Sequence, residues 1–597
     1  MDQPTGTAPA ALDIAERLDR LARQELDEVE RFIGTVPPIE CAVLLIEACR
    51  CLDHMHVVQK LSAKEEGKLS VHDFDIVVRG WNVLFGLLMQ RKGAGEFNGV
   101  PLRESVPELR QALMGMLHFA GRYVLLNRAA EMVRHGMVSS MAVGDEVELK
   151  LSDRTLSDHF HDQLDHGKFA ELNAKVLRGY KAVANDAGTV QHLRDVMGKL
   201  TFPWKTPHGV MVGYSADPEI DAYFLDAVTQ NTLQWRDDAG IHPRAELGGC
   251  SGGLLTTVVH VLMSFHTKHI MFVEEAIKLH PGVNQHMSLT IWKTRADLMT
   301  SLVTATAASE EEVSVALDLI TVRADDAAYF LSEQAPCIPL VIELCNGYLL
   351  TPVSGVFRNP FNAIRMLRES ASIAIRNAFR EHREEWMAED LYALFEGPRF
   401  QRVSGQTKLR RDGRIVTDID AAIFDDATGE LVLFQLKWQD FTSSSVRTQR
   451  SKAKNFSDQV QDWAERVMCW IDQFGVAALC RALKIKPPDG AVPRHVLLVA
   501  VGRSNARFRS YGYTVAENIL CLPWPQFARL RLAIGPGQDF FKLLMEEVIK
   551  ENAAPVERKP LPYVLERHGL KVTFQDIWSK LEGDDKDPGA AAAGQLK

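Results

Sequence analysis

The 597-residue sequence contains no C-x-x-C pair, no repeat of fixed period and no apolar run long enough to span a lipid bilayer. Its nine cysteines are odd in number and scattered, which argues against a disulfide framework and a cysteine-rich zinc site. The most apolar stretch, residues 254–265, is only twelve residues long and includes four polar side chains, so we predict a buried helix there. A secretory leader, with a basic end and an apolar run, is also missing. We therefore expect a cytoplasmic protein with reduced cysteines and no membrane partner.

The composition is that of an ordinary globular protein. Hydrophobic residues make up 46% and charged residues 24% of the chain, close to the average of folded domains. A chain of this length is expected to contain more than one domain. From the apolar spacing we predict a flexible leader (1–11), a mostly helical N-terminal region (12–360, with a subdomain split near 140–240), an α/β domain (363–545), a helical extension (546–582) and a disordered tail (583–597). The expected fold class is a multidomain α+β/α/β protein.

The α/β domain is predicted from a change of periodicity after residue 363. We expect a long helix over 363–395, strands over 416–424 and 431–438 with a turn between them, a helix over 456–474, and strands over 495–501 and 519–522. The order helix, strand, strand, helix, strand, strand predicts a mixed central sheet with helices on its faces.

Charge is divided unequally along the chain. Residues 396–515 contain 19 Lys and Arg against 13 Asp and Glu, a formal charge of +6, whereas the remainder has 49 against 65, a charge of −16. The basic residues of this segment gather in three clusters, at 408–414, 447–454 and 503–509. A single basic cluster is usually a solvated surface, but three clusters around one motif favour a nucleic-acid partner.

Two neighbouring strands of the predicted sheet carry polar residues that interrupt apolar rows. Because strand side chains alternate between faces, Asp418 and Asp420 share one face, and Gln435 and Lys437 share a face of the next strand. Burying a lysine without a partner is costly, and the carboxylates of the adjoining strand are suitable partners. The pattern predicts either a buried ion pair or a metal site.

The spacing of Asp420, fourteen residues and then Gln435-Leu436-Lys437 resembles the PD-(D/E)xK nuclease superfamily, in the Q-x-K variant of Mrr-like restriction endonucleases. The resemblance is confined to the C-terminal domain and implies a restriction-endonuclease-like core. It also implies that Asp420 and Gln435 bind Mg²⁺ or Mn²⁺, that Lys437 orients the attacking water and stabilises charge on the phosphate, and that Asp418 is an accessory acid. The chain departs from the family pattern because no proline precedes the first aspartate, and because Gln435 replaces a carboxylate that would bind a cation more strongly.

The resemblance further implies a supporting glutamate on the helix before the motif. We choose Glu384, because it lies on the same helical face as the apolar residues Met387 and Leu391. The alternatives are Glu381, Glu385 and Glu389, and a solvated helix glutamate is the simpler interpretation. We expect phosphate contacts from the basic residues that flank the motif, which are Arg410, Arg411, Arg414, Arg447, Arg450, Lys452 and Lys454.

The expected function is metal-dependent hydrolysis of phosphodiester bonds, with DNA as the partner and the helical N-terminal region as a regulatory or sensing part, in restriction or anti-phage defence. Such hydrolysis needs a hydroxide-like nucleophile and compensation for charge on the phosphate, which a divalent cation and an ammonium supply. The alternatives are a catalytically inactive nuclease-like fold that binds nucleic acid or acts as a scaffold, and a purely structural hairpin. The N-terminal region could also bind a protein partner or a second copy of the chain, and the sequence does not distinguish DNA from RNA.

Three other groupings of reactive residues have simpler interpretations. The segment Gly249–Gly253 fits G-x-S-x-G, but no strand precedes it, which favours a glycine-rich helix start. The His and Asp residues between 158 and 166 match no metal-binding spacing, which favours a polar helix or loop. On a helix, Cys49, Cys51, His54 and His56 would point around the whole circumference, which argues against a zinc site.

Overall fold

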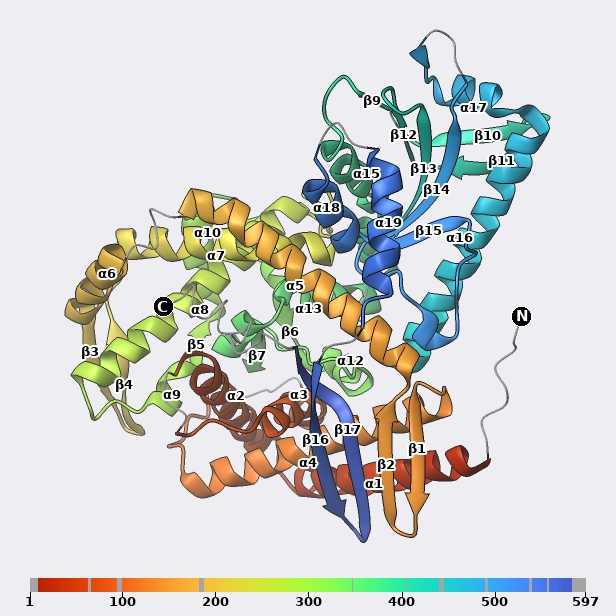
Figure 1. The fold of residues 1–597 in the computed structure, drawn as a ribbon. Coiled ribbons are helices and arrows are strands. Elements are labelled where there is room, and N and C mark those ends of the chain that lie inside the picture. The colour runs from red at the N-terminus through yellow and green to blue at the C-terminus, as the bar shows by residue number, and fades with distance from the viewer. Residues whose placement is uncertain are drawn as a thin grey trace.

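The computed structural model describes residues 9–62, 66–93, 99–181, 187–345, 347–403, 405–439, 445–488, 492–535, 539–555 and 558–581 (Figure 1). Helices dominate the N-terminal region, and a mixed sheet lies in the C-terminal half, as expected at this coarse level. None of the helices in these ranges combines the length and apolar composition that crossing a bilayer requires. The predicted tail over 583–597 and most of the predicted leader lie outside the described residues; the leader's last residues, from Pro9, already belong to a helix.

The chain begins with four long helices that pack on one another. A Cβ atom at Gly80 would lie 2.0 Å from the carbonyl oxygen of Leu117, so only glycine permits the close crossing of the third and fourth helices. Their buried apolar faces form one core together with residues from 322–367. The four helices are α1 (Pro9–Gly34), α2 (Pro38–Leu61), α3 (Val71–Lys92) and α4 (Pro107–Arg134).

The middle of the chain surrounds one buried helix, α8 (Gly252–Leu279), which includes the helix predicted over 254–265. Four short strands near it form a sheet in the order β5-β8-β7-β6, and β3 and β4 form a separate hairpin. The other helices are α5 (Asp153–Lys181), α6 (Ala187–Leu200), α7 (Pro218–Ala239), α9 (Gln285–Leu289), α10 (Arg295–Thr306), α11 (Glu310–Ile320) and α12 (Ala327–Ser332). The strands are β3 (Thr201–Thr206), β4 (Gly209–Tyr214), β5 (Ile291–Thr294), β6 (Thr321–Val322), β7 (Val341–Cys345) and β8 (Tyr348–Thr351).

Two strands of the N-terminal region and the last two described strands form one four-stranded sheet, with the order β1-β2-β17-β16 (Figure 1). Its strands are β1 (Val138–Val143), β2 (Glu146–Leu151), β16 (Arg558–Arg567) and β17 (Leu570–Leu581), and β17 runs parallel to β2. The prediction of a helical extension over 546–582 is therefore wrong beyond Asn552, where the last helix ends. Strand β17 buries Val572, Phe574 and Trp578, whose positions differ by multiples of two. Burial of every second residue is typical of a strand with one face on a core.

The α/β unit is preceded by three helices where one long helix over 363–395 was predicted. Ser372 ends the first of them and caps the second, its hydroxyl accepting a hydrogen bond from the backbone N–H of Ile375. The helices of this part are α13 (Pro360–Ala371), α14 (Ile373–Arg380), α15 (Arg383–Ala393), α16 (Val446–Phe474), α17 (Val476–Leu483), α18 (Trp524–Ala533) and α19 (Phe540–Asn552). The strands are β9 (Phe400–Arg402), β10 (Thr407–Arg411), β11 (Arg414–Ile419), β12 (Ala421–Asp425), β13 (Glu430–Lys437), β14 (His495–Gly502) and β15 (Ile519–Pro523).

Five of these strands form the central mixed sheet, in the order β15-β14-β13-β12-β9. Strands β13, β14 and β15 are parallel, whereas β12 is antiparallel to β13. Helices α16 and α17 cover one face, and α15, α18 and α19 cover the other (Figure 1). The predicted order of helices and strands is present, but the single strand predicted over 416–424 is two strands. β11 pairs with β10 in a separate hairpin, and the chain bends at Asp420 before β12 joins the sheet.

Candidate active site

Asp420 occupies the bend between β11 and β12, directly beside β13. Its backbone N–H donates to the carbonyl oxygen of Phe434 at 3.2 Å, which fixes the bend against the sheet. Its carboxylate oxygen Oδ2 accepts hydrogen bonds from the side-chain amide of Gln435 and from the backbone N–H of Leu436, the latter at 2.8 Å. The side chain is only 8% exposed. A carboxylate held in this way is fixed in position and shielded from water.

Strand β13 presents Gln435 and Lys437 to the same face of the sheet. Val432, Phe434 and Leu436 pack into the core under α15, α18 and α19, whereas Leu431 and Leu433 pack toward α16. By alternation, Gln435 and Lys437 follow Leu431 and Leu433 on the α16 face, as the sequence predicts. Gln435 is buried and Lys437 is half-buried at the end of the strand. The polar pair therefore ends an apolar row beside Asp420.

Burial and the charges of Glu384 and Lys437 shift the pKa of Asp420. The pKa of this carboxyl is raised from an ordinary 3.8 to about 6, mainly by burial and in smaller part by the negative charge of Glu384. The Leu436 N–H and the Lys437 ammonium act in the opposite direction and lower the pKa. Asp420 therefore binds a proton more readily than an exposed aspartate does. A cation bound beside it would stabilise the negative charge of the carboxylate.

Glu384 is the helix glutamate that acts on this carboxylate. It lies exposed in the first turn of α15, whereas the neighbouring Glu385 and Glu389 face Arg244, at 3.1 Å and 3.8 Å. Glu381 lies before α15, at the C-cap of α14. Of the four candidates, Glu384 is the one whose charge raises the pKa of Asp420.

Gln406, which our sequence analysis missed, joins the two aspartates. Its side-chain amide nitrogen donates to Asp418 at 2.7 Å and to Asp420 Oδ1 at 3.2 Å. No periodicity or motif marks Gln406, because the contact arises from the bend that carries β10 and β11 away from the sheet. Asp418 itself is half-buried, and its carbonyl oxygen accepts a hydrogen bond from the indole of Trp463 on α16.

The residues around Asp420 could supply oxygen ligands to a divalent cation of the magnesium type. The side-chain N–H₂ group of Gln406 is the positive end of the amide dipole, and it contacts both Asp418 and Asp420. A cation at the position of this N–H₂ group would contact both carboxylates. The amide oxygen of Gln435 would face this position after rotation about the last side-chain bond. Oxygen ligands of this kind suit Mg²⁺ and Mn²⁺. Asp418, Asp420 and Glu384 do not form a compact group of three ligands among the described residues, so amide and water oxygens would complete the shell.

Of the predicted phosphate-binding residues, the structure leaves three as unpaired cations. Arg411 and Arg414 are exposed on the β10–β11 hairpin and Arg447 is exposed at the start of α16, and none of the three has an ion pair within the described ranges. The remaining four are in part engaged by the protein. Arg410 donates to the carbonyl oxygen of Gly413, Arg450 to a ring nitrogen of His135, and Lys454 pairs with Asp458, while Lys452 is half-buried.

The third basic cluster, at 503–509, is largely structural. Arg507 is buried and donates to Asp162 at 2.7 Å and to Asp165 at 2.6 Å, which docks α5 on the α/β unit. Arg503 pairs with Asp390 at 2.6 Å. The same contacts explain the His and Asp grouping over 158–166, which lies on helix α5 and binds arginines.

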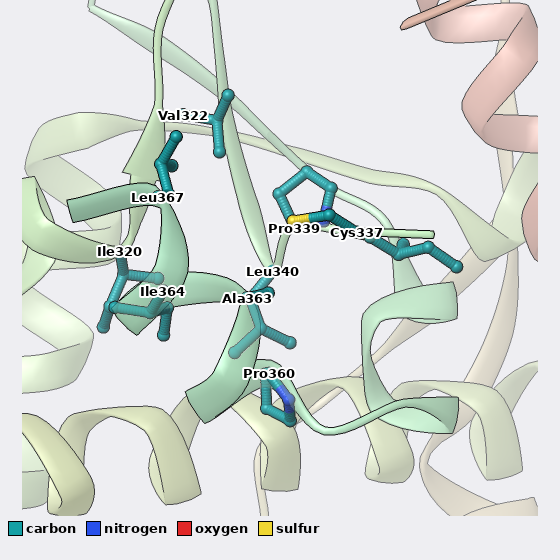
Figure 2. Close-up of a pocket in the computed structure, with 10 residues that line it drawn as sticks. Ile320, Val322, Cys337, Pro339, Leu340, Pro360, Ala363, Ile364 and Leu367 are labelled. Carbon is teal, nitrogen blue, oxygen red and sulfur yellow. The ribbon is translucent and has the colours of Figure 1, made fainter. Parts of the chain in front are cut away.

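Two other features of the sequence also have structural roles. The hydroxyl of Ser251 caps α8 by accepting a hydrogen bond from the N–H of Leu254 at 3.1 Å, so the G-x-S-x-G segment is a helix start. A small pocket near α13 is lined by apolar residues, and Figure 2 shows Ile320, Val322 and Leu367 among them. Its lining contains one thiol, that of Cys337, and no charged side chain.

A second set of metal-binding side chains lies in the helical region, far along the chain from Asp420. Glu47, Cys51 and His286 are buried, and one ligand atom of each lies within 4.8 Å of the others. This is the one such group of three in the part of the chain that the structure describes. Comparisons of the chain with models of protein families, with curated proteins and with solved structures each gave no match.

Proposed function

We propose that this protein is a metal-dependent nuclease that hydrolyses phosphodiester bonds in DNA. The observation that carries the proposal is the arrangement around Asp420, which is buried, bonded to Gln435, and under the electrostatic influence of both Lys437 and Glu384. These four residues come from three separate segments of the chain. The spacing resembles the PD-(D/E)xK nucleases, and the exposed Arg411, Arg414 and Arg447 in the flanking segments support a nucleic-acid partner.

In this proposal Asp420 and Gln435 hold Mg²⁺ or Mn²⁺ through side-chain oxygens. When bound, the cation would lower the pKa of a water molecule and would offset the negative charge that develops on the phosphate. Asp420 accepts from the Leu436 N–H, which keeps one oxygen oriented while the other faces Gln406. Lys437, with three N–H donors, orients the attacking water and donates to a phosphate oxygen as negative charge develops there. Glu384 and Asp418 assist by adding negative charge next to the cation.

The arginines act on the rest of the substrate. Guanidinium groups bind phosphates in a bidentate manner and carry no sequence information, so they position the strand without selecting a sequence. The large helical region, which α5 docks on the α/β unit, then has a regulatory or sensing role, as in restriction or anti-phage defence. A challenge of cells with phage, comparing the wild-type chain with an inactive variant, tests this biological setting.

A nuclease-like fold that binds nucleic acid without cutting it is the second candidate. The observation in its favour is that Asp420 already accepts hydrogen bonds from Gln435, Leu436 and Gln406, which leaves its carboxylate satisfied without a cation. An amide at position 435 also binds a divalent cation less strongly than a carboxylate. In this case the same surface would bind DNA with no metal requirement.

A cleavage assay separates the two candidates. Full-length protein is incubated with supercoiled plasmid, linear duplex, single-stranded DNA and RNA, with Mg²⁺, with Mn²⁺ or with EDTA. We expect cutting of DNA that requires the cation and that is lost in Lys437→Met but retained in Lys550→Met, an exposed lysine of α19. Cutting at the wild-type rate by Lys437→Met, or in EDTA, would refute the proposed site. Binding without any cutting would favour the second candidate.

A further inference from the structure

Helix α2 meets helix α9 at a buried group of side chains of mixed chemistry. Glu47, Cys51 and His286 are 2%, 4% and 5% exposed, and one ligand atom of each lies within 4.8 Å of the other two. Exposed acidic clusters attract cations nonspecifically, whereas this group combines an oxygen, a sulfur and a nitrogen ligand inside the protein. A glutamate is almost never buried this fully unless it has a partner.

The geometry of α2 brings two of the ligands together. Residues four apart lie one above the other on a helix, so Glu47 and Cys51 share a face, and His54, three residues further, continues it. The imidazole Nε2 of His286 lies 2.9 Å from Glu47 Oε1, although the two residues are 239 positions apart in the chain. The His54 ring lies beside the His286 ring, with centroids 5.4 Å apart. Neither ring nitrogen of His54 has a hydrogen bond to the described part of the chain.

The groups around Glu47 orient it toward this position. Arg50 donates a hydrogen bond to Oε2 of Glu47 at 3.1 Å, and the hydroxyl of Ser105 donates to Oε1 of the same carboxylate. These contacts fix the carboxylate as the hydrogen bonds around a metal ligand do. They would also suffice for a metal-free polar network, in which Cys51 would have no part. The thiol of Cys51 makes no hydrogen bond among the described residues, yet its sulfur lies within 4.8 Å of the two other ligand atoms.

We propose that Glu47, Cys51 and His286 bind one zinc ion that links α2 to α9. Zinc accepts carboxylate oxygen, imidazole nitrogen and thiolate sulfur in one site, whereas magnesium does not take sulfur ligands. On binding, the Cys51 thiol releases its proton to solvent and its sulfur bonds to the ion. His286 binds through Nε2 as the tautomer protonated at Nδ1, and the hydrogen bond from Nε2 to Glu47 is replaced by bonds from both groups to zinc.

The test uses the full-length protein and does not depend on nuclease activity. The protein is stripped with a chelator and titrated with Co²⁺ and then with Zn²⁺, in excess Mg²⁺ to occupy oxygen-only sites. We expect one equivalent of Co²⁺ to give thiolate-to-cobalt charge-transfer absorption, which zinc then abolishes. Cys51→Ala should lose this absorption and lower zinc affinity by more than about 100-fold, because changes to the outer contacts alone cost about 10–100-fold.

Cys49→Ala is the matched control, since Cys49 is a fully buried thiol on the same helix but outside the group. It should bind cobalt and zinc as the wild type does. Zinc should raise the melting temperature of wild type and Cys49→Ala but not of Cys51→Ala. Melting curves without metal show that each variant folds, and His286→Gln serves if Cys51→Ala does not. The proposal is overturned if the wild type gives no thiolate-to-cobalt band, or if Cys51→Ala binds zinc as tightly as Cys49→Ala.

Discussion

Asp420→Asn should make the metal-free protein more stable, although it removes the central residue of the proposed site. Burial raises the pKa of Asp420 from 3.8 to about 6 in the folded protein, so ionising this carboxyl disfavours the folded state. The difference corresponds to at most about 3 kcal/mol above pH 7, because one pKa unit is about 1.4 kcal/mol. Asparagine can keep the acceptor for Gln435 and Leu436 and loses only the longer hydrogen bond from Gln406, at 3.2 Å, while Gln406 stays bonded to Asp418.

The direction in which stability changes with pH follows from the number of protons bound at Asp420 in the folded and unfolded states. Between the two pKa values the folded protein binds more protons at Asp420 than the unfolded chain does, so wild-type stability falls as the pH rises through about 4 to 6. The stabilisation by Asp420→Asn should therefore approach about 3 kcal/mol near pH 8 and largely vanish near pH 4. Urea unfolding in EDTA at both pH values measures it. With Mg²⁺ the wild type should gain stability and the variant should gain none.

Asp462→Asn, an exposed acid on α16, is the control and should show no such dependence on pH. If Asp420→Asn were destabilising to the same extent at both pH values, the carboxylate would be favourable in the folded state and our explanation of its pKa would fail. The opposite result, higher stability together with lost cleavage, is typical of a functional residue kept at a cost to stability.

Three further predictions concern the neighbours of Asp420. Gln435→Glu should lose stability by several kcal/mol in EDTA, because it places a second carboxylate beside Asp420, and regain it with Mg²⁺; a melting temperature that does not recover with metal would contradict the nuclease site. Gln406→Ala should bind Mg²⁺ about fivefold more tightly, because a hydrogen bond of about 1 kcal/mol no longer competes for the carboxylates, whereas weaker binding in a thermal-shift titration would mean that Gln406 is a ligand. Replacing Arg411, Arg414 and Arg447 together by Ala should reduce the slope of log affinity for DNA against log salt by about 3, and an unchanged slope would remove these residues from the interface.

The sequence was sufficient to predict the parts of the fold that depend on local patterns. The apolar rows of β13 and their polar ending at Gln435 and Lys437 are visible in the alternation of residues, and the structure has the same alternation. The Glu384 assignment came from the apolar stripe of α15 and stays a prediction, because the side chain is exposed and is linked to Asp420 only through its charge. Ser372 is a local signal that was present in the sequence but was overlooked. Its hydroxyl accepts a hydrogen bond from the N–H three residues later, which is the usual N-cap of a helix.

The contacts that were missed join distant segments. Asp420 lies at a bend because β11 pairs with β10 instead of continuing into the sheet, and no pattern within residues 416–424 distinguishes one strand from two. Gln406 reaches the site only through that bend. Cys51 and His54 were judged unsuitable for metal because, with Cys49 and His56, they would point around the whole helix circumference, and no sequence pattern shows that His286 contacts this helix at Glu47.

The pairing of β17 with β2 has a consequence for the synthesis of this protein. The ribosome releases β1 and β2 more than 400 residues before the strand that completes their sheet. During that time β2 has an open edge, and the apolar core beneath it lacks Phe574 and Trp578. Open edges of this kind invite pairing with other chains. A nascent chain stalled at residue 360 should therefore associate with chaperones or aggregate, and the N-terminal sheet becomes complete only when the whole α/β unit has been translated.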